Sequence, residues 1–140
     1  DWAEYFAFAK ETFSEKLMGE AGLCTAGEGF LAFGDNLYRM PERMPGVKGL
    51  KVLRPGLHLG TLKKNRFEPA HALALALCPK DVKHVWNLSV EEAAAYLKGQ
   101  TFSAEGEKGW YLICVDDISL GWGKLAGGIM KNHYPKGLRK

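Results

Sequence analysis

With 140 residues, 46% of them hydrophobic and 25% charged, the chain is long enough for one domain or two small ones, and this composition argues against disorder. No apolar run reaches the roughly 18 residues of a membrane-spanning helix, and the acidic, aromatic start is unlike a signal peptide. The three cysteines are odd in number and far apart, so we expect a reduced, cytoplasmic setting. The net charge of +3 is modest and excludes no class of partner by itself.

The first predicted element is an amphipathic helix. Its apolar residues recur at helical spacing: Trp2, Tyr5, Phe6, Ala9, Phe13 and Leu17. Gly19 and Gly22 are expected to end this helix. Because the chain starts inside the pattern and without an initiator Met, we expect a fragment of a longer protein.

Short strands are expected next. Residues 29–40 predict two strands around a Gly-Asp-Asn turn, and Pro41 and Pro45 are expected to break regular structure. Residues 51–60 have strand character that a Pro-Gly turn interrupts.

A short helix is predicted from Glu68-Pro69 through Leu77, because proline suits the first turn of a helix. Cys78-Pro79 is expected to stop it. The polar segment 78–84 is the best candidate for a linker, so the sequence predicts one unit over residues 1–80 and another over residues 81–140.

The second unit opens with a helix. Ser89 and Glu92 form a capping box, in which each side chain satisfies a free backbone N–H of the first turn. The helix is expected to run to Lys98, and Gly99 supplies the left-handed turn after it.

Strands follow this helix. Residues 110–115 and 118–124 predict two strands around a turn at Asp116-Asp117, and Gly127-Gly128 permits a sharp bend. A helix, then strands, with many glycines favours a small α+β domain built on a curled sheet or barrel.

No catalytic set assembles in the sequence. A nucleotide-binding domain would need a Gly-rich loop between a strand and a helix, and none fits. Cys24, Cys78 and Cys114 are scattered, so we expect neither zinc nor a disulfide but small buried side chains. The histidines share no metal-ligand spacing; they are His58, His71, His84 and His133. We therefore expect no catalytic and no metal-binding residue.

Basic residues are segregated from acids. None of the residues from Arg43 to Phe67 is acidic, although several are basic. This pattern suggests a surface that binds a polyanion such as RNA, or else ordinary solvated lysines. Within it, residues 53–69 are expected to form a turn-rich loop that runs into a helix N-terminus, where phosphate binds well. The candidate RNA contacts there are Lys63, Lys64, Asn65 and Arg66.

A second acid-free stretch, residues 120–139, joins glycines to basic and aromatic side chains. Glycines let a ligand approach the backbone, and lysines neutralise phosphates. Trp122 and Tyr134 either stack on unpaired bases or pack in the core. The candidate RNA contacts are Trp122, Lys124, Lys131, Asn132, His133, Tyr134, Lys136 and Arg139.

The segments RPGLHLGTLKKNRFEPAHALALAL (54–77) and LGWGKLAGGIMKNHYPKGLR (120–139) resemble the C-terminal region of bacterial Nop/Sun-type RNA 5-methylcytosine methyltransferases of the RsmF kind. In that family, a Rossmann-like domain binds S-adenosylmethionine and supplies two catalytic cysteines. A small linking domain and a PUA-like RNA-binding domain follow. Neither the cofactor loop nor the cysteine motifs have a match here, and Cys78-Pro79 reverses the Pro-Cys order of that active site.

The resemblance implies an α+β fold, with a mixed α/β pre-PUA linking domain over residues 1–80 and a PUA-like β-barrel domain over residues 81–140. It implies a non-catalytic accessory region that holds no cofactor and positions structured ribosomal RNA for the catalytic domain of the same polypeptide, which uses S-adenosylmethionine. Two alternatives stay open. The chain could be a structural module that packs on the catalytic domain, or a PUA-like fold that binds a small ligand or modified base in a closed pocket near Trp122.

Overall fold

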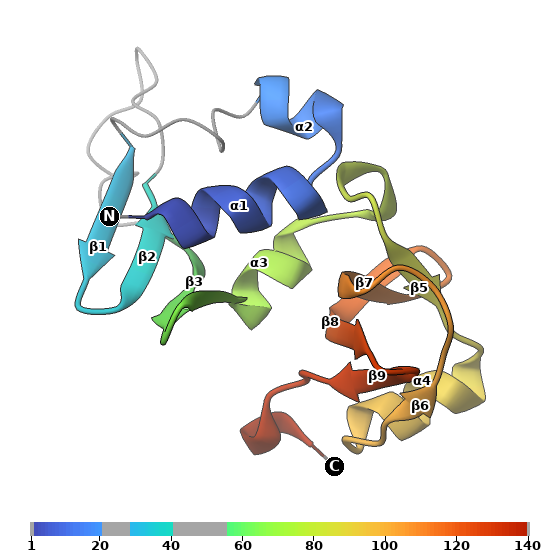
Figure 1. Ribbon diagram of the computed structural model, residues 1–140. Coiled ribbons are helices and arrows are strands. Elements are labelled where there is room, and N and C mark those ends of the chain that lie inside the picture. Colours follow the sequence, from blue (N-terminus) through green and yellow to red (C-terminus); the bar gives the residue numbers. More distant parts are fainter. Residues whose placement is uncertain (1, 21–28, 41–55, 140) are drawn as a thin grey trace, which may run out of the picture.

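The computed structural model describes residues 2–20, 29–40 and 56–139, which form two sheets with helices packed between and around them (Figure 1). The fold is α+β, as predicted. Within these ranges, no helix is both long and apolar enough to cross a membrane.

The first sheet is antiparallel, in the order β1-β2-β3-β4. Its strands are β1 (Phe30–Phe33), β2 (Asn36–Arg39), β3 (Leu57–Lys63) and β4 (Arg66–Pro69). The helices of this half are α1 (Ala3–Thr12), α2 (Glu15–Glu20) and α3 (His71–Ala76). Helix α3 contacts β3 and also β8 (Ile118–Ala126) of the second sheet, and α1 contacts β4 and also β7 (Gly109–Val115) of the second sheet. The two helices therefore connect the sheets.

The single N-terminal helix predicted from the apolar spacing is wrong, because the helix breaks at Phe13. Phe13 is extended, with φ −82° and ψ 146°, and forms an isolated bridge with Val82. Its side chain is fully buried, and the N–H of Ser14 donates to the carbonyl of Asp81 at 2.8 Å. Burial of Phe13 against this distant segment outweighs continued helical hydrogen bonding.

The predicted pair of strands around Gly34 is confirmed as the β1–β2 hairpin. The turn-rich loop expected over residues 53–69 is wrong where the structure describes it, because β3 and β4 form a hairpin whose turn is Lys64-Asn65. Asn65 has φ 58°, a conformation that asparagine tolerates better than most residues. The strand character expected over residues 51–60 is confirmed at residues 57–60, which belong to β3. Gly19 lies inside α2 and does not end the helix, so that expectation is wrong. The other expectations here, Gly22, Pro41, Pro45 and residues 51–55, lie outside the described residues.

Pro69 ends a strand rather than opening a helix. It is the last residue of β4, an edge strand, where a missing N–H costs no ladder hydrogen bond. Helix α3 begins two residues later, with Ala70 at its N-cap and no side-chain capping bond. The phosphate-binding helix start expected at Glu68-Pro69 is therefore absent at that position.

The second sheet is curled and has the order β5-β7-β8-β9-β6, with β5 and β7 parallel. Its elements are β5 (Val85–Asn87), α4 (Val90–Leu97), β6 (Phe102–Ser103), β7 (Gly109–Val115), β8 (Ile118–Ala126) and β9 (Ile129–Asn132). Short 3₁₀ turns lie at Pro79–Asp81 and Lys136–Leu138. This is the PUA-like half that was predicted, with β5, β6 and β9 in addition.

Local signals in this half are confirmed. The Ser89–Glu92 capping box closes with bonds of 2.9 and 3.1 Å, and Gly99 takes the left-handed conformation after α4. Asp116 and Asp117 have φ 48° and 64°, the left-handed pair expected of a type I′ hairpin turn.

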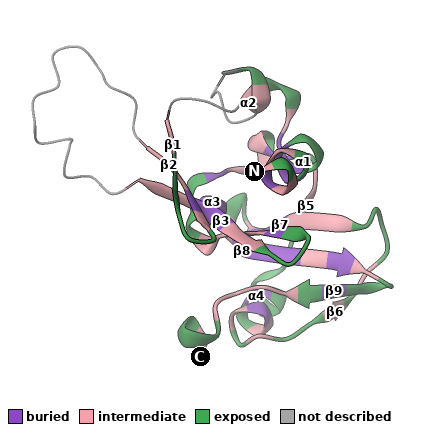
Figure 2. Cartoon of the chain, turned by 60° about the vertical axis from the view of Figure 1, so that its left-hand side comes forward, coloured by how far each residue is buried: buried purple, intermediate pink, exposed green. Residues whose placement is uncertain are grey.

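One hydrophobic cluster spans both halves of the chain. Tyr5, Phe13 and Leu59 of the first half share it with Leu112 and Trp122 of the second. Figure 2 marks buried residues in purple on α1 and β3 of the first half and on β8 of the second. The connecting segment 78–84 is packed rather than free, since Val82 is buried. Because this cluster crosses residue 80, the division of the chain at that point stays a prediction.

Candidate nucleic-acid interface

A row of side chains crosses the curled sheet at its open end. Trp110 of β7 lies opposite Lys124 of β8, and Lys124 lies opposite Lys131 of β9. Directly opposite residues of antiparallel strands project from the same face. That face is the one that Trp122 and Leu112 bury, because residues two apart on a strand share a side. This face of the sheet is therefore buried at Leu112 and Trp122 and basic and aromatic at Trp110, Lys124 and Lys131, which we call the basic margin.

Trp110 is the aromatic centre of this margin. The Lys124 ammonium lies 5.1 Å from its ring centroid, and the His133 ring lies 4.6 Å away, nearly edge-on. Trp110 is only partly buried. The sequence prediction missed Trp110, although its place at the start of the strand predicted next to the one that carries Lys124 was a usable signal.

The two basic stretches of the sequence meet here. His133 is near the β3–β4 hairpin as well as its own sheet: burial lowers its pKa, Lys124, Lys131 and Arg66 lower it further, and Glu68 acts in the opposite direction. Arg66 is exposed, as are Lys63, Lys64 and Asn65 at the hairpin tip. Arg66 of the first sheet and Lys124 and Lys131 of the second therefore all lie close enough to His133 to lower its pKa.

An open groove of about 910 Å³ lies beside this margin. Its lining combines α1, the β3–β4 hairpin tip, the loop before β7 and the start of β7. The residues that line it are Glu4, Ala7, Phe8, Glu11, Thr12, Asn65, Arg66, Phe67, Lys83, His84, Glu107, Lys108, Gly109, Trp110 and Lys124. The helix α1 contributes carboxylates, whereas the strands contribute cations and the indole.

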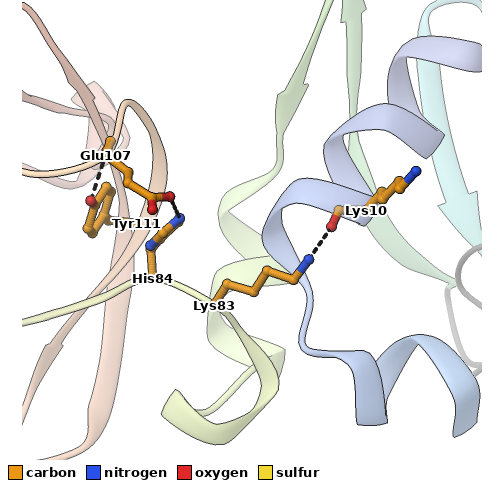
Figure 3. Close-up of polar contacts among 5 residues, drawn as sticks. All are labelled: Lys10, Lys83, His84, Glu107 and Tyr111. Atoms are coloured by element: carbon orange, nitrogen blue, oxygen red, sulfur yellow. Dashed lines mark hydrogen bonds and ion pairs between the residues drawn. The ribbon is translucent and has the colours of Figure 1, made fainter.

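Polar contacts hold the walls of this groove together (Figure 3). The Lys83 ammonium donates to the Lys10 carbonyl of α1 at 2.7 Å. The neighbouring His84 pairs with Glu107 at 3.3 Å and stacks on Tyr111, whose hydroxyl donates to the Glu107 carbonyl at 2.8 Å. Lys83 and His84, which are neighbours in the connecting segment, thus contact opposite sides of the groove: Lys83 contacts α1, and His84 contacts the loop before β7.

The structure corrects the role predicted for Trp122. Its side chain is 1% exposed, and its indole N–H donates to the Ala70 carbonyl at 2.9 Å. The rings of Phe8 and Trp110 pack against it edge-on at 5.9 and 6.3 Å. A ring enclosed in this way cannot stack on a base, so Trp122 belongs to the core.

Three further candidates anchor the C-terminal segment to α4. The Asn132 amide donates to the carbonyls of Tyr96 and Gln100, both at 2.8 Å, and its oxygen accepts from the N–H of Tyr134. Arg139 donates to the Tyr134 carbonyl at 3.1 Å. The Tyr134 ring packs against Tyr96 of α4 at 5.5 Å and edge-on against His71 at 5.3 Å. All three side chains are therefore held by contacts within the chain, which indicates a structural role for them.

Lys136 is exposed in the last 3₁₀ turn, outside the groove lining. Of all the candidates from the sequence, the structure thus brings Arg66, Lys124, Lys131 and His133 together, with Asn65 in the same groove.

Cys78 and Cys114, the cysteines that the structure describes, are not arranged for nucleophilic chemistry. Burial, followed by Asp117 and Cys78, raises the pKa of the Cys114 thiol to about 11. The Cys78 thiol donates to the Asp81 carboxylate at 3.2 Å. Cys24 lies outside the described residues. Over the ranges that the structure covers, no group of three or more His, Cys, Asp or Glu residues is placed to hold a metal ion.

Comparison with protein families agrees with both halves of this fold. Residues 7–77 match the model of the RsmF rRNA methyltransferase first C-terminal domain. Residues 83–140 match the model of the methyltransferase RsmF PUA domain. The two matches occur in the order that the sequence resemblance predicts, which confirms that resemblance. The chain therefore belongs to the RsmF rRNA methyltransferase family, of which it contains the first C-terminal domain and the PUA domain.

Proposed function

We propose that this chain is the RNA-binding accessory region of a cytoplasmic rRNA (cytosine-5-)-methyltransferase, and that it holds structured RNA for the catalytic domain of the same polypeptide. The observation that carries the proposal is that Arg66, Lys124 and Trp110 line one groove, with Lys131 directly opposite Lys124 on the next strand. S-adenosylmethionine would be bound by the catalytic domain, and we expect the chain alone to transfer no methyl group.

The charges suit phosphate binding. Lys63, Lys64 and Arg66 are exposed on the hairpin, and Lys131 is exposed on β9. Each lysine or arginine that neutralises a phosphate releases counterions, so affinity falls steeply with salt. Phosphate contacts of this kind fix the position of an RNA without reading its sequence. Positioning a substrate for another domain requires this kind of contact.

The experiment is RNA binding across a salt series. Replacement of Lys124 or Lys131 by Ala should lower the slope of log affinity against log salt by about 0.7 on single-stranded RNA. Lys98→Ala is the matched control. Lys98 is exposed at the end of α4, which packs on the other face of the sheet.

Loss of slope in both variants but not in the control would support the proposal. If both variants bound RNA as tightly as the unmodified chain, with the same slope, the basic margin would not be the RNA surface. The alternative of a module that packs on the catalytic domain would then account for these charges.

A further inference from the structure

The groove sets the carboxylates of α1 opposite cations of the strands, while Lys83 and Glu107 add one charge of the other sign to each side. Glu4 and Glu11 are seven residues apart on α1, which places them on one face of the helix, and both line the groove. Arg66 and Lys124 line it from the strands. A duplex presents two phosphate backbones, and the second would meet the carboxylates. A single strand presents one backbone, which the cationic wall can take while the bases turn toward α1.

The volume also favours a small occupant. About 910 Å³ lies near the upper end of the roughly 300–1,000 Å³ that small-ligand sites occupy. Duplex RNA is recognised over much longer surfaces, by shape and across successive grooves. The space therefore fits a few unpaired nucleotides.

The Lys124 side chain covers one face of the Trp110 ring, and it can move away from that face. The Lys124 ammonium lies over this ring at 5.1 Å, and Lys124 is only partly buried. A lysine has a flexible four-carbon stem, so its ammonium can move to a nearby phosphate and uncover the indole. Trp122, on the same face, has no such freedom because it is enclosed by core side chains and bonded to Ala70.

We infer that this groove binds an unpaired nucleotide, with its base stacked on Trp110 and its phosphates on Arg66 and Lys124. The inference rests on the proposed RNA-binding function and names the form of RNA that the site takes. Aromatic stacking accepts any base, because every base has a π-face. The groove thus selects unpaired over paired RNA without selecting a sequence.

The test compares a short single-stranded RNA with a blunt duplex of the same sequence, by fluorescence anisotropy on the whole chain. Trp110→Leu keeps an apolar side chain but removes the π-face, and Trp110→Phe restores a smaller one. We expect Trp110→Leu to weaken single-strand binding about 5- to 150-fold, the range for one stacked base. Duplex affinity and the salt slope should stay unchanged, and Trp110→Phe should recover part of the loss.

A second measurement does not depend on the folding of any variant. A single strand that carries 2-aminopurine should lose fluorescence on binding the unmodified chain, because stacking on an aromatic ring quenches this base. Arg66→Ala and Lys124→Ala should each reduce the salt slope for the single strand by about 0.7.

The outcomes separate this inference from the function on which it rests. If RNA binds with the expected salt slope but Trp110→Leu leaves single-strand affinity unchanged, or 2-aminopurine is not quenched, the groove does not hold a stacked base. That result leaves RNA binding intact. If the unmodified chain binds neither oligonucleotide nor folded ribosomal RNA, the proposed function itself fails.

Discussion

Replacement of Trp122 by Ala should destabilise the whole chain rather than one half. The ring is 1% exposed and belongs to the cluster that both sheets share, and its N–H is bonded to Ala70 at 2.9 Å. Removing a buried tryptophan costs about 3–5 kcal/mol. The free energy of unfolding of natural domains is about 5–15 kcal/mol, so the variant should keep only part of its stability. With a urea m-value of about 2 kcal/mol per molar, the midpoint should fall by about 1.5–2.5 M.

The assay is urea unfolding followed by circular dichroism, with Trp110→Leu as the matched control. Trp110 lies in the same ring cluster but is only partly buried, so its midpoint should shift much less. Trp122→Phe keeps an aromatic ring and loses the hydrogen bond, and should fall between the two. A midpoint for Trp122→Ala within about 0.3 M of the unmodified chain, together with lost RNA affinity, would refute the core assignment; the m-value converts that shift to about 0.6 kcal/mol.

Three further predictions follow from the structure. Burial lowers the pKa of His133 from 6.5, so the unfolded chain gains its proton first and stability falls as pH drops below about 6.5; His133→Gln should flatten this fall in urea melts at pH 7 and pH 5. Gly60→Ala places a methyl against the Glu68 carbonyl oxygen and the Phe67 ring and should cost about 1–3 kcal/mol, whereas Gly137→Ala meets nothing within 4 Å; equal melting temperatures for the two would contradict this packing. Asn-Gly in place of Asp116-Asp117 suits the left-handed turn better and should raise the unfolding free energy by about 0.5–1 kcal/mol, and a lowered melting temperature would count against the turn assignment.

Local chemistry explains which elements could be predicted from the sequence. The Ser89–Glu92 box and the Asp116-Asp117 turn depend on residues within a few positions of each other, and both are found as predicted. The break at Phe13 depends on Val82, nearly seventy residues away, so the helical spacing of the residues around Phe13 could not predict it. Strand β6 has only two residues and pairs with the distant β9, so it has no periodicity of its own.

The candidate site shows the same division. Basic residues could be assigned to an RNA surface from composition, because charge segregation is visible in the chain itself. The choice of aromatic residue could not, since Trp110 and Trp122 lie on one face of the same sheet. What distinguishes them is the packing of α1 and α3, which covers Trp122 and stops short of Trp110. The residues next to each tryptophan in the sequence do not indicate which of the two rings the distant helices bury.

The shared core has a consequence for the order in which the chain is made. A ribosome releases the first sheet and its helices before Leu112 and Trp122, which complete the cluster around Phe8 and Leu59, have been synthesised. During that interval the first half holds an apolar surface open to solvent. The same surface would be exposed permanently in a product cut between residues 77 and 83, the interval between the two family matches. The newly made N-terminal half should therefore depend on chaperones until β8 covers this surface, and the truncated product should aggregate.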